Sequence, residues 1–221
     1  MILAAGRGHR LRPVTDFIPK PLLQVAGETL LGRHLQALSS AGIRHIVINT
    51  AWLGGLIRRY TGDGTQFGVE IAISEEGDVA LETGGGIHRA LPLLGAQPFL
   101  LINADIWTDL DLGTVAPLQP GDLASLVLVP NPPHNPDGDF GLRADRVVDK
   151  GERLTYAGVA MLHPALFDNC DAGIFPLAPL LREAIRDGHV SGQRHDGVWF
   201  DCGAADRLDA TRRYAARRRA K

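Results

Sequence analysis

The segment from Leu3 to Gly27 carries the residue types that could bind a polyphosphate. Gly6 and Gly8 follow an apolar stretch, so backbone N–H groups there can approach phosphate oxygens without intervening side chains. Arg10 lies on the same loop, and Lys20 stands between two prolines in a stretch that we expect not to be helical. Each cation alone is better explained as a solvated surface charge. Together with the glycine turn, they predict a triphosphate cradle.

Two aspartates end short apolar stretches later in the chain. Asp105 follows the apolar run 99–103, and Asp201 follows residues 198–200. In an α/β sheet, ligands gather at the carboxyl ends of the strands. Mg²⁺ prefers one or two carboxylates together with phosphate oxygens and water. A lone aspartate at a strand end more commonly caps the following turn, so the residues alone leave both roles open.

A second glycine-rich turn, ALETGGGI, contains Glu82 and Thr83 followed by three glycines at 84–86. Glycines that open a helix allow a base or a ribose to press against the backbone, where Glu82 or Thr83 can hydrogen-bond its polar edge. In the alternative interpretation, the glycines only permit close packing between a strand and a helix. The residues favour neither interpretation over the other.

The first half of the chain alternates between strand-like and helix-like patterns. We expect strands at 1–5, 45–49, 69–73 and 98–103, and helices at 30–42, 53–60 and 85–94. This βαβαβ order predicts an α/β fold with a Rossmann-like, mostly parallel central sheet and helices on both faces. Such a sheet would present the loops described above at the carboxyl ends of its strands.

The pattern after residue 105 is less regular and predicts a small β lobe beside the sheet. We expect a strand at 123–129, a loop at 130–139, short strands and turns at 140–161, a helix at 177–187, a strand at 198–201 and a helix from 206.

The bulk properties exclude several classes of partner and site. The chain has 221 residues, of which 45% are hydrophobic. Its net charge is −2, so it has no overall positive charge that would attract nucleic acid or an anionic membrane. Cys170 and Cys202 are far apart and lack metal-ligand spacing, and the histidines form no evident nucleophile triad. We expect a cytoplasmic protein, either a monomer or a small homo-oligomer, with no membrane segment or signal peptide.

The segment LAAGRGHRLRPVTDFIPKPLLQVAG resembles the signature of the sugar-phosphate nucleotidyltransferases, a GxGxRxxPxT loop followed by PKP. The residues on that pattern are Gly6, Gly8, Arg10, Pro13, Thr15, Pro19, Lys20 and Pro21. The resemblance extends over nearly the whole chain and includes WFDCG at 199–203. It implies an enzyme that joins a nucleoside triphosphate to a sugar 1-phosphate and releases pyrophosphate. One domain over 1–221 is then expected, with a nucleotide-binding part at 1–110, a sugar-binding part at 111–205 and a C-terminal helix at 206–221.

The resemblance also implies individual roles. Arg10 would hold the β- and γ-phosphates, and Lys20 would contact the α-phosphate and the sugar phosphate. Asp105 and Asp201 would bind Mg²⁺, although Ala104 replaces the glycine or serine that is usual before the first aspartate. The expected nucleotide-binding residues are Ala4, Ala5, Gly6, Gly8, His9, Arg10, Lys20, Glu82, Thr83, Gly84 and Asn103. The candidate sugar-binding residues, each of which alone is more often a turn or surface residue, are Gly141, Lys150, Glu152 and Gly158.

Two segments refine the expected substrates. LETGGGI and the stretch LTYAGVAMLHPALF at 154–167 look like those of small bacterial uridylyltransferases that act on N-acetylmuramate α-1-phosphate. UTP and that sugar phosphate are therefore the expected substrates, and the product would serve cell-wall recycling. The alternatives are a guanylyl- or thymidylyltransferase for another hexose or heptose 1-phosphate, and a non-catalytic regulator that binds sugar nucleotides. A dehydrogenase is disfavoured because Leu11 replaces the third glycine of the dinucleotide fingerprint.

Overall fold

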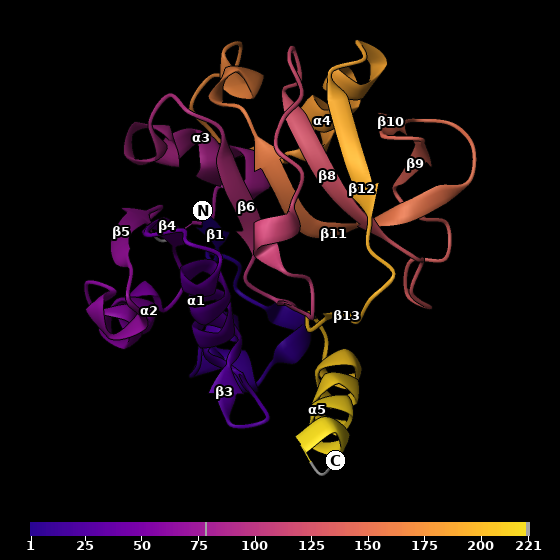
Figure 1. Cartoon of the computed structure of the whole chain (residues 1–221). Helices are drawn as coiled ribbons and strands as arrows, with labels where there is room; N and C mark the ends of the chain where they lie inside the picture. The colour runs from indigo at the N-terminus through magenta and orange to yellow at the C-terminus, as the bar shows by residue number, and fades with distance from the viewer. Residues whose placement is uncertain (78, 220–221) are drawn as a thin grey trace. The chain divides into compact units, whose positions relative to one another are not determined.

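The computed structural model describes residues 1–77 and 79–219, which form two compact units (Figure 1). Among these residues, the first unit comprises 2–80, 103–113 and 198–219. The second unit comprises residue 1, 81–102 and 114–197. Each unit therefore combines segments that are far apart in the sequence, and both candidate metal-binding aspartates belong to the first unit.

In the first unit, the three strands β5, β4 and β1 are neighbours in that order, and both neighbouring pairs are parallel. The bounds are β1 (Ile2–Leu3), α1 (Leu30–Ser40), β4 (His45–Thr50), α2 (Gly54–Thr61) and β5 (Glu70–Glu75). The expected βαβαβ order is thus confirmed in this unit. A parallel pair needs a crossover of this kind, because its strands cannot be joined by a tight turn.

The position of α1 follows directly from its sequence. Leu31, Leu35 and Leu38 are fully or almost fully buried, and their spacing of four and three residues places them on one face of the helix. Thr29 caps the helix, since its hydroxyl accepts a 2.9 Å hydrogen bond from the Gly32 amide. Such a cap contributes about 1 kcal/mol to stability.

Two short antiparallel ladders complete the first unit. They pair β2 (Gln24–Val25) with β3 (Glu28–Thr29), and β7 (Ile106–Thr108) with β13 (Trp199–Asp201). The terminal helix α5 (Ala205–Arg219) follows β13, and the expected end of this helix at 221 lies outside the described residues. The sequence pattern predicts β13 and α5 but not β7, because three residues after a loop give no measurable period.

An aromatic cluster holds α5 against the β7–β13 ladder. Trp107 of β7 lies 6.1 Å from Phe200 and 5.7 Å from Tyr214, measured between ring centroids, and the latter two rings are 5.3 Å apart. Leu11 and Leu208 belong to the same buried core. This core therefore connects the glycine-rich loop, β7 and the C-terminal helix.

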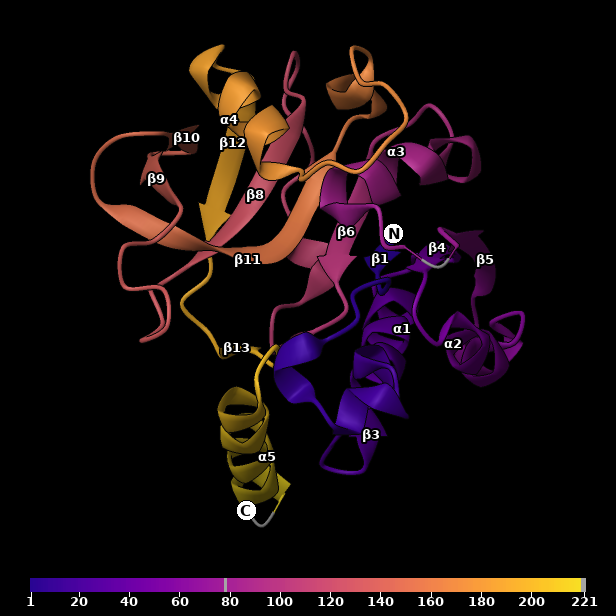
Figure 2. The same ribbon diagram turned by 180° about the vertical axis from the view of Figure 1, so that it is seen from behind.

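The second unit contains six strands in the order β6-β11-β8-β12-β10-β9, of which only β8 and β12 pair in parallel (Figure 2). Their bounds are β6 (Phe99–Asn103), β8 (Ala124–Val129), β9 (Phe140–Arg143), β10 (Arg146–Val148), β11 (Arg153–Leu162) and β12 (Val190–Arg194). The helices of this unit are α3 (Glu82–Leu94) and α4 (Ala178–Arg186). The α/β class is confirmed. The pairs β1–β4, β4–β5 and β8–β12 are parallel, whereas the other pairs of the second unit are antiparallel and make the sheet mixed.

The interpretation of 140–161 as only short strands and turns is wrong for β11. This strand runs for ten residues, and its register against β8 shifts between Tyr156 and Ala160. Gly158 lies at the shift with φ +74°, a conformation that glycine adopts without steric cost. A bulge therefore continues the strand where glycine in the sequence indicates a turn.

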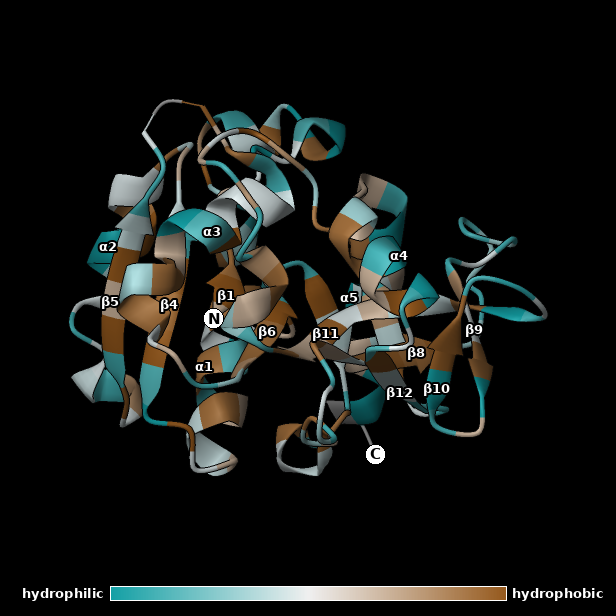
Figure 3. Cartoon of the chain, turned by 90° about the horizontal axis from the view of Figure 1, so that it is seen from above, coloured by the Kyte–Doolittle hydropathy of each residue, from teal (hydrophilic) through white to brown (hydrophobic). Residues whose placement is uncertain are grey.

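Buried strands supply most of the hydrophobic core. All six residues of β8 are buried, and Figure 3 shows the hydrophobic colour along β6 and β8. Strands buried on both faces appear as continuous apolar runs rather than alternating ones. No helix among the described residues is long and apolar enough to cross a membrane.

Candidate active site

The glycine-rich loop begins where β1 ends, and its two glycines differ in what they permit. Gly8 has φ +72°, and a Cβ placed on it would lie 3.1 Å from Thr15 Cγ2. The Gly8 carbonyl accepts hydrogen bonds of 2.9 Å from both the Leu11 amide and the Thr15 hydroxyl. A Cβ on Gly6 would meet no atom within 4 Å. Gly8 therefore sets the turn, whereas Gly6 leaves open space beside the backbone.

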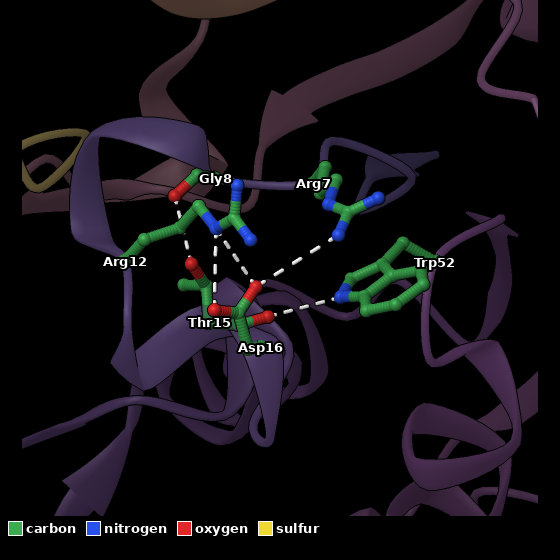
Figure 4. A network of polar contacts seen from close by, with 6 residues as sticks. All are labelled: Arg7, Gly8, Arg12, Thr15, Asp16 and Trp52. Carbon is green, nitrogen blue, oxygen red and sulfur yellow. Dashed lines mark hydrogen bonds and ion pairs between the residues drawn. The ribbon is translucent and has the colours of Figure 1, made fainter.

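A polar network supports the loop from outside (Figure 4). The Trp52 indole donates a 2.9 Å hydrogen bond to the Thr15 carbonyl, and the Arg7 guanidinium lies 3.9 Å from the centre of the same indole ring. Asp16 accepts from Arg12 at 2.9 Å and lies 3.8 Å from Arg7. Sequence analysis did not identify Arg7, Asp16 or Trp52, because only the fold brings residue 52 to the loop. The network orients Arg7 toward Trp52 and Asp16.

Lys20 and Asp105 form an ion pair in the first unit. Lys20 Nζ donates to Asp105 Oδ2, and the two side chains are only 15% and 22% exposed. The expectation that Lys20 lies in a non-helical stretch is wrong, because a 3-10 turn spans Lys20–Leu22. Pro21 is compatible with that turn, since the first residues of a helix need no amide donor.

The β7–β13 ladder brings the two predicted metal ligands together. Asp201 is the cross-strand partner of Ile106, and the Cys202 amide donates a 2.8 Å hydrogen bond to the Asp105 carbonyl. Asp201 Oδ1 accepts from the Gly203 amide at 2.5 Å. Residues almost a hundred positions apart thus become immediate neighbours, as the predicted pair of carboxylates requires.

The chemistry of this donor set fits Mg²⁺. Carboxylate oxygens are hard ligands, and Mg²⁺ takes one or two of them together with phosphate oxygens and water. No group of three or more histidine, cysteine, aspartate or glutamate side chains arranged to hold a metal occurs among the described residues. Asp105 and Asp201 would therefore hold the ion jointly with a phosphate ligand rather than in a complete protein cage.

Arg10 approaches the same region from the loop, and Arg207 approaches it from α5. A Cβ placed on Gly203 would lie 3.0 Å from Arg10 Nη2, 3.1 Å from Arg207 Nη2 and 2.7 Å from Asp201 Oδ1. Arg207 Nη2 lies 3.3 Å from Asp201 Oδ2. Sequence analysis did not identify Arg207. Its position in the first turn of the helix that follows WFDCG was the available signal.

Burial makes Cys202 unreactive although it lies among these charges. Burial raises the pKa of its thiol to about 11, and the nearby Asp105 and Asp201 also raise it. The thiolate is the nucleophilic form of cysteine. Cys202 is therefore neutral near pH 7.

A buried pair fixes the start of the loop. The Ala4 amide donates a 2.7 Å hydrogen bond to Asn49 Oδ1, and Asn49 Nδ2 donates to Glu76 Oε1 at 2.6 Å. Asn49 and Glu76, which sequence analysis did not identify, are both buried. The Ala4 amide is therefore occupied within the protein. Of the other candidates on this side, Ala5 is buried, Asn103 is partly buried and His9 is exposed.

In the second unit, the glycines of ALETGGGI pack against their own chain. A Cβ on Gly84 would lie 2.5 Å from the Phe175 ring, and one on Gly85 would lie 2.1 Å from the Gly173 carbonyl oxygen. These two glycines therefore permit close packing against residues 173–175, which does not by itself decide between the two interpretations of the turn. The Thr83 hydroxyl accepts a 2.9 Å hydrogen bond from the Leu177 amide, and Glu82 is exposed with φ +60°. Contact of this turn with a base stays a prediction.

The candidate sugar-binding residues partly cluster, again within the second unit. A Cβ on Gly141 would lie 2.8 Å from the Lys150 carbonyl oxygen and 3.3 Å from that of Glu152. Lys150 and Glu152 are exposed on the turn between β10 and β11. Gly158 lies at the bulge of β11, several residues away from that turn. The structure brings three of the four candidates together.

Comparisons with known proteins place the chain in a family. The sequence profile of the nucleotidyl transferase family matches residues 1–144. The N-acetylmuramate alpha-1-phosphate uridylyltransferase of Neisseria meningitidis is 52% identical over 94% of this chain and 94% of its own. The protein of the same name from Caulobacter vibrioides is 34% identical over 92% and 90%, respectively.

A solved structure supports the fold assignment. A Bacillus anthracis protein in complex with a sucrose has a TM-score of 0.84 at 19% identity, with 97% of this chain and 93% of that chain covered. The likeness confirms a mixed α/β fold with a central sheet and helices on both sides. With the family match over residues 1–144 and the 52% identical relative, the chain is identified as a member of the nucleotidyl transferase family.

Proposed function

We propose that this enzyme transfers a uridylyl group from UTP to N-acetylmuramate α-1-phosphate, giving UDP-N-acetylmuramate and pyrophosphate. The observation that carries the proposal is the relative of that name, which is 52% identical over 94% of both chains. We further propose that the product serves cell-wall recycling. The chain acts as one nucleotidyltransferase domain on small-molecule substrates. It does so either as a monomer or as a small homo-oligomer.

The reaction needs charge neutralisation more than proton transfer. A phosphate monoester has its second pKa near about 6, so the attacking oxygen of the sugar phosphate is already ionised at neutral pH. Lys20 neutralises charge at the α-phosphorus, and Arg10 holds the β- and γ-phosphates as pyrophosphate leaves. Cations that are already in position before the reaction begins need no reorganisation as charge develops in the transition state. When bound to Asp105 and Asp201, Mg²⁺ supplies Lewis-acid neutralisation of the phosphate oxygens.

The remaining contacts are assigned by unit. In the first unit, we assign the nucleotide to the loop and to the end of β6, with Ala4, Ala5, Gly6, Gly8, His9 and Asn103. In the second unit, we assign nucleotide contacts to Glu82, Thr83 and Gly84, and sugar contacts to Gly141, Lys150, Glu152 and Gly158. The carboxylate of the muramate lactyl group needs a cation or amide donors, and Lys150 and Arg143 are the candidates.

A substrate panel tests the proposal. Four nucleoside triphosphates are combined with N-acetylmuramate, N-acetylglucosamine, glucose and mannose 1-phosphates, and kcat/KM is measured for each pair. We expect the highest value for UTP with the muramate substrate. Preference for GTP or dTTP with a neutral hexose would instead indicate one of the alternative transferases. Sugar-nucleotide binding without turnover in any combination would indicate a regulator.

A further inference from the structure

Arg207 is a mostly buried cation for which the proposed chemistry gives no role. Its side chain is 15% exposed, and its Nη2 forms an ion pair of 3.3 Å with Asp201 Oδ2. Its Nε and Nη2 atoms are shielded from solvent and donate no hydrogen bond within the described part of the chain. Buried N–H groups nearly always have an acceptor. The ion pair with Asp201 therefore leaves donors of this guanidinium unused.

A second guanidinium, that of Arg10, lies beside Gly203. The Nη2 atoms of Arg10 and Arg207 are within 3.0 and 3.1 Å of one point, the position of a Cβ on Gly203. One guanidinium comes from the loop and the other from α5. Asp201 Oδ1 lies 2.7 Å from the same point, so one negative charge stands against two positive ones and the two guanidinium groups retain an excess of positive charge. An anion placed between the guanidinium groups would relieve their repulsion and supply the missing acceptors.

We propose that Arg207 and Arg10 form a guanidinium pair that binds the pyrophosphate portion of the triphosphate and holds it as the leaving group. Guanidinium groups present parallel N–H donors that match phosphate oxygens. Gly203 is needed because any side chain would fill the space between the two groups. The inference rests on the proposed nucleotidyl transfer but on neither UTP nor muramate, because every reaction of this class releases pyrophosphate.

The direct test is binding of inorganic pyrophosphate by isothermal titration calorimetry, with a chelator present and no divalent metal. Arg207→Gln should raise Kd about tenfold, since a charge-assisted contact is lost. Arg207→Lys, which keeps the charge but not the fork of donors, should give an intermediate Kd. Arg213→Gln is the matched control, because Arg213 is exposed on the same helix. Its Kd should equal that of the wild type.

Asp201→Asn separates anion binding from a purely structural role of Arg207. Without metal, this change removes the carboxylate that competes for Arg207, so pyrophosphate should bind about threefold more tightly. The gain should disappear when Arg207→Gln is added. Melting temperatures identify variants that remain folded. If Arg207→Gln does not fold, Arg207→Lys replaces it in the binding measurements.

Three results would overturn the inference. These are unchanged pyrophosphate affinity in folded Arg207→Gln and Arg207→Lys, a gain in Asp201→Asn that persists without Arg207, and no pyrophosphate binding by the wild type. Failure of the proposed function has a different signature. Turnover of UTP with N-acetylmuramate α-1-phosphate would be absent while pyrophosphate binding still depended on Arg207.

Discussion

Lys20 and Arg207 each stand beside one of the two carboxylates that the β7–β13 ladder brings together. Lys20 donates to Asp105, and Arg207 lies 3.3 Å from Asp201. Both carboxylates are mostly buried, and a buried charge is costly unless it is paired. The cations therefore stabilise the carboxylates in the metal-free protein. On our proposal, the same cations contact phosphate groups when the substrates bind.

The first prediction concerns the carboxylates. Asp105→Asn and Asp201→Asn should each lower kcat by at least about 100-fold, because each removes a metal-binding charge at nearly constant volume. Their affinity for Mn²⁺, followed by electron paramagnetic resonance, should fall in parallel. Asp209→Asn is the matched control, since Asp209 is exposed on α5. Full activity in both active-site variants would refute the assignment of the metal ligands.

The second prediction concerns Lys20. Lys20→Ala should lower kcat by about 100-fold and change KM for the triphosphate much less, because a cation near the α-phosphorus acts mainly as charge redistributes in the transition state. Steady-state kinetics at saturating sugar phosphate gives both constants. A rise in KM at unchanged kcat would show that Lys20 binds ground state and transition state equally.

At the scale of elements, glycines permit contacts that no other residue would allow. The N-terminal turn of α3 lies so close to residues 173–175 that the Gly85 amide donates a 3.0 Å hydrogen bond to the Phe175 carbonyl. The Thr83 hydroxyl accepts from the Leu177 amide just ahead of α4. These contacts fix the start of α3 in the second unit, which is the turn that carries Glu82.

The third prediction tests this packing. Gly85→Ala should lower the free energy of unfolding by about 1–3 kcal/mol, because the new Cβ would lie 2.1 Å from a backbone oxygen. Gly55→Ala, in the first turn of α2 with no atom within 4 Å of the new Cβ, should instead raise it by about 0.5–1 kcal/mol. Urea unfolding of both variants provides the comparison. Equal effects would show that Gly85 is not needed for close packing.

At the scale of the whole molecule, a buried histidine links stability to pH. His34 of α1 is 4% exposed, and burial, together with the nearby Arg33, lowers its pKa from 6.5 to about 4. The unfolded chain therefore binds a proton below pH 6.5 that the folded protein binds only near pH 4. The stabilisation is complete above pH 6.5 and is lost as the pH falls from 6.5 to about 4.

The fourth prediction follows from this linkage. His34→Gln should lose less stability than the wild type between pH 7 and pH 4, with a difference of about 3 kcal/mol over the full range. Urea unfolding at several pH values measures the slope. His45→Gln is the matched control at an exposed position, because the His45 side chain is 85% exposed. The same slope in His34→Gln and the wild type would contradict the assignment.

Elements with a clear period could be predicted from the sequence, and short or irregular ones could not. The repeated leucines of α1 and the apolar run of β6 have their expected places within a few residues. The three-residue β7 and the strand β12 were missed, because too few residues repeat or alternate to give a signal. Gly158 indicates a turn in the sequence yet forms a bulge within β11. Only pairing with β8 resolves that ambiguity.

The sequence by itself determined the family, and it predicted a phosphate site because Gly8, Arg10 and Lys20 lie close together in the sequence and their types indicate phosphate. Only the tertiary structure decided which distant residues join them. Asp201 reaches Asp105 through the β7–β13 ladder, and Arg207 reaches Arg10 because α5 packs on Trp107. Spacing along the chain carries no record of such contacts, because long-range pairing depends on burial of apolar surface from several segments at once.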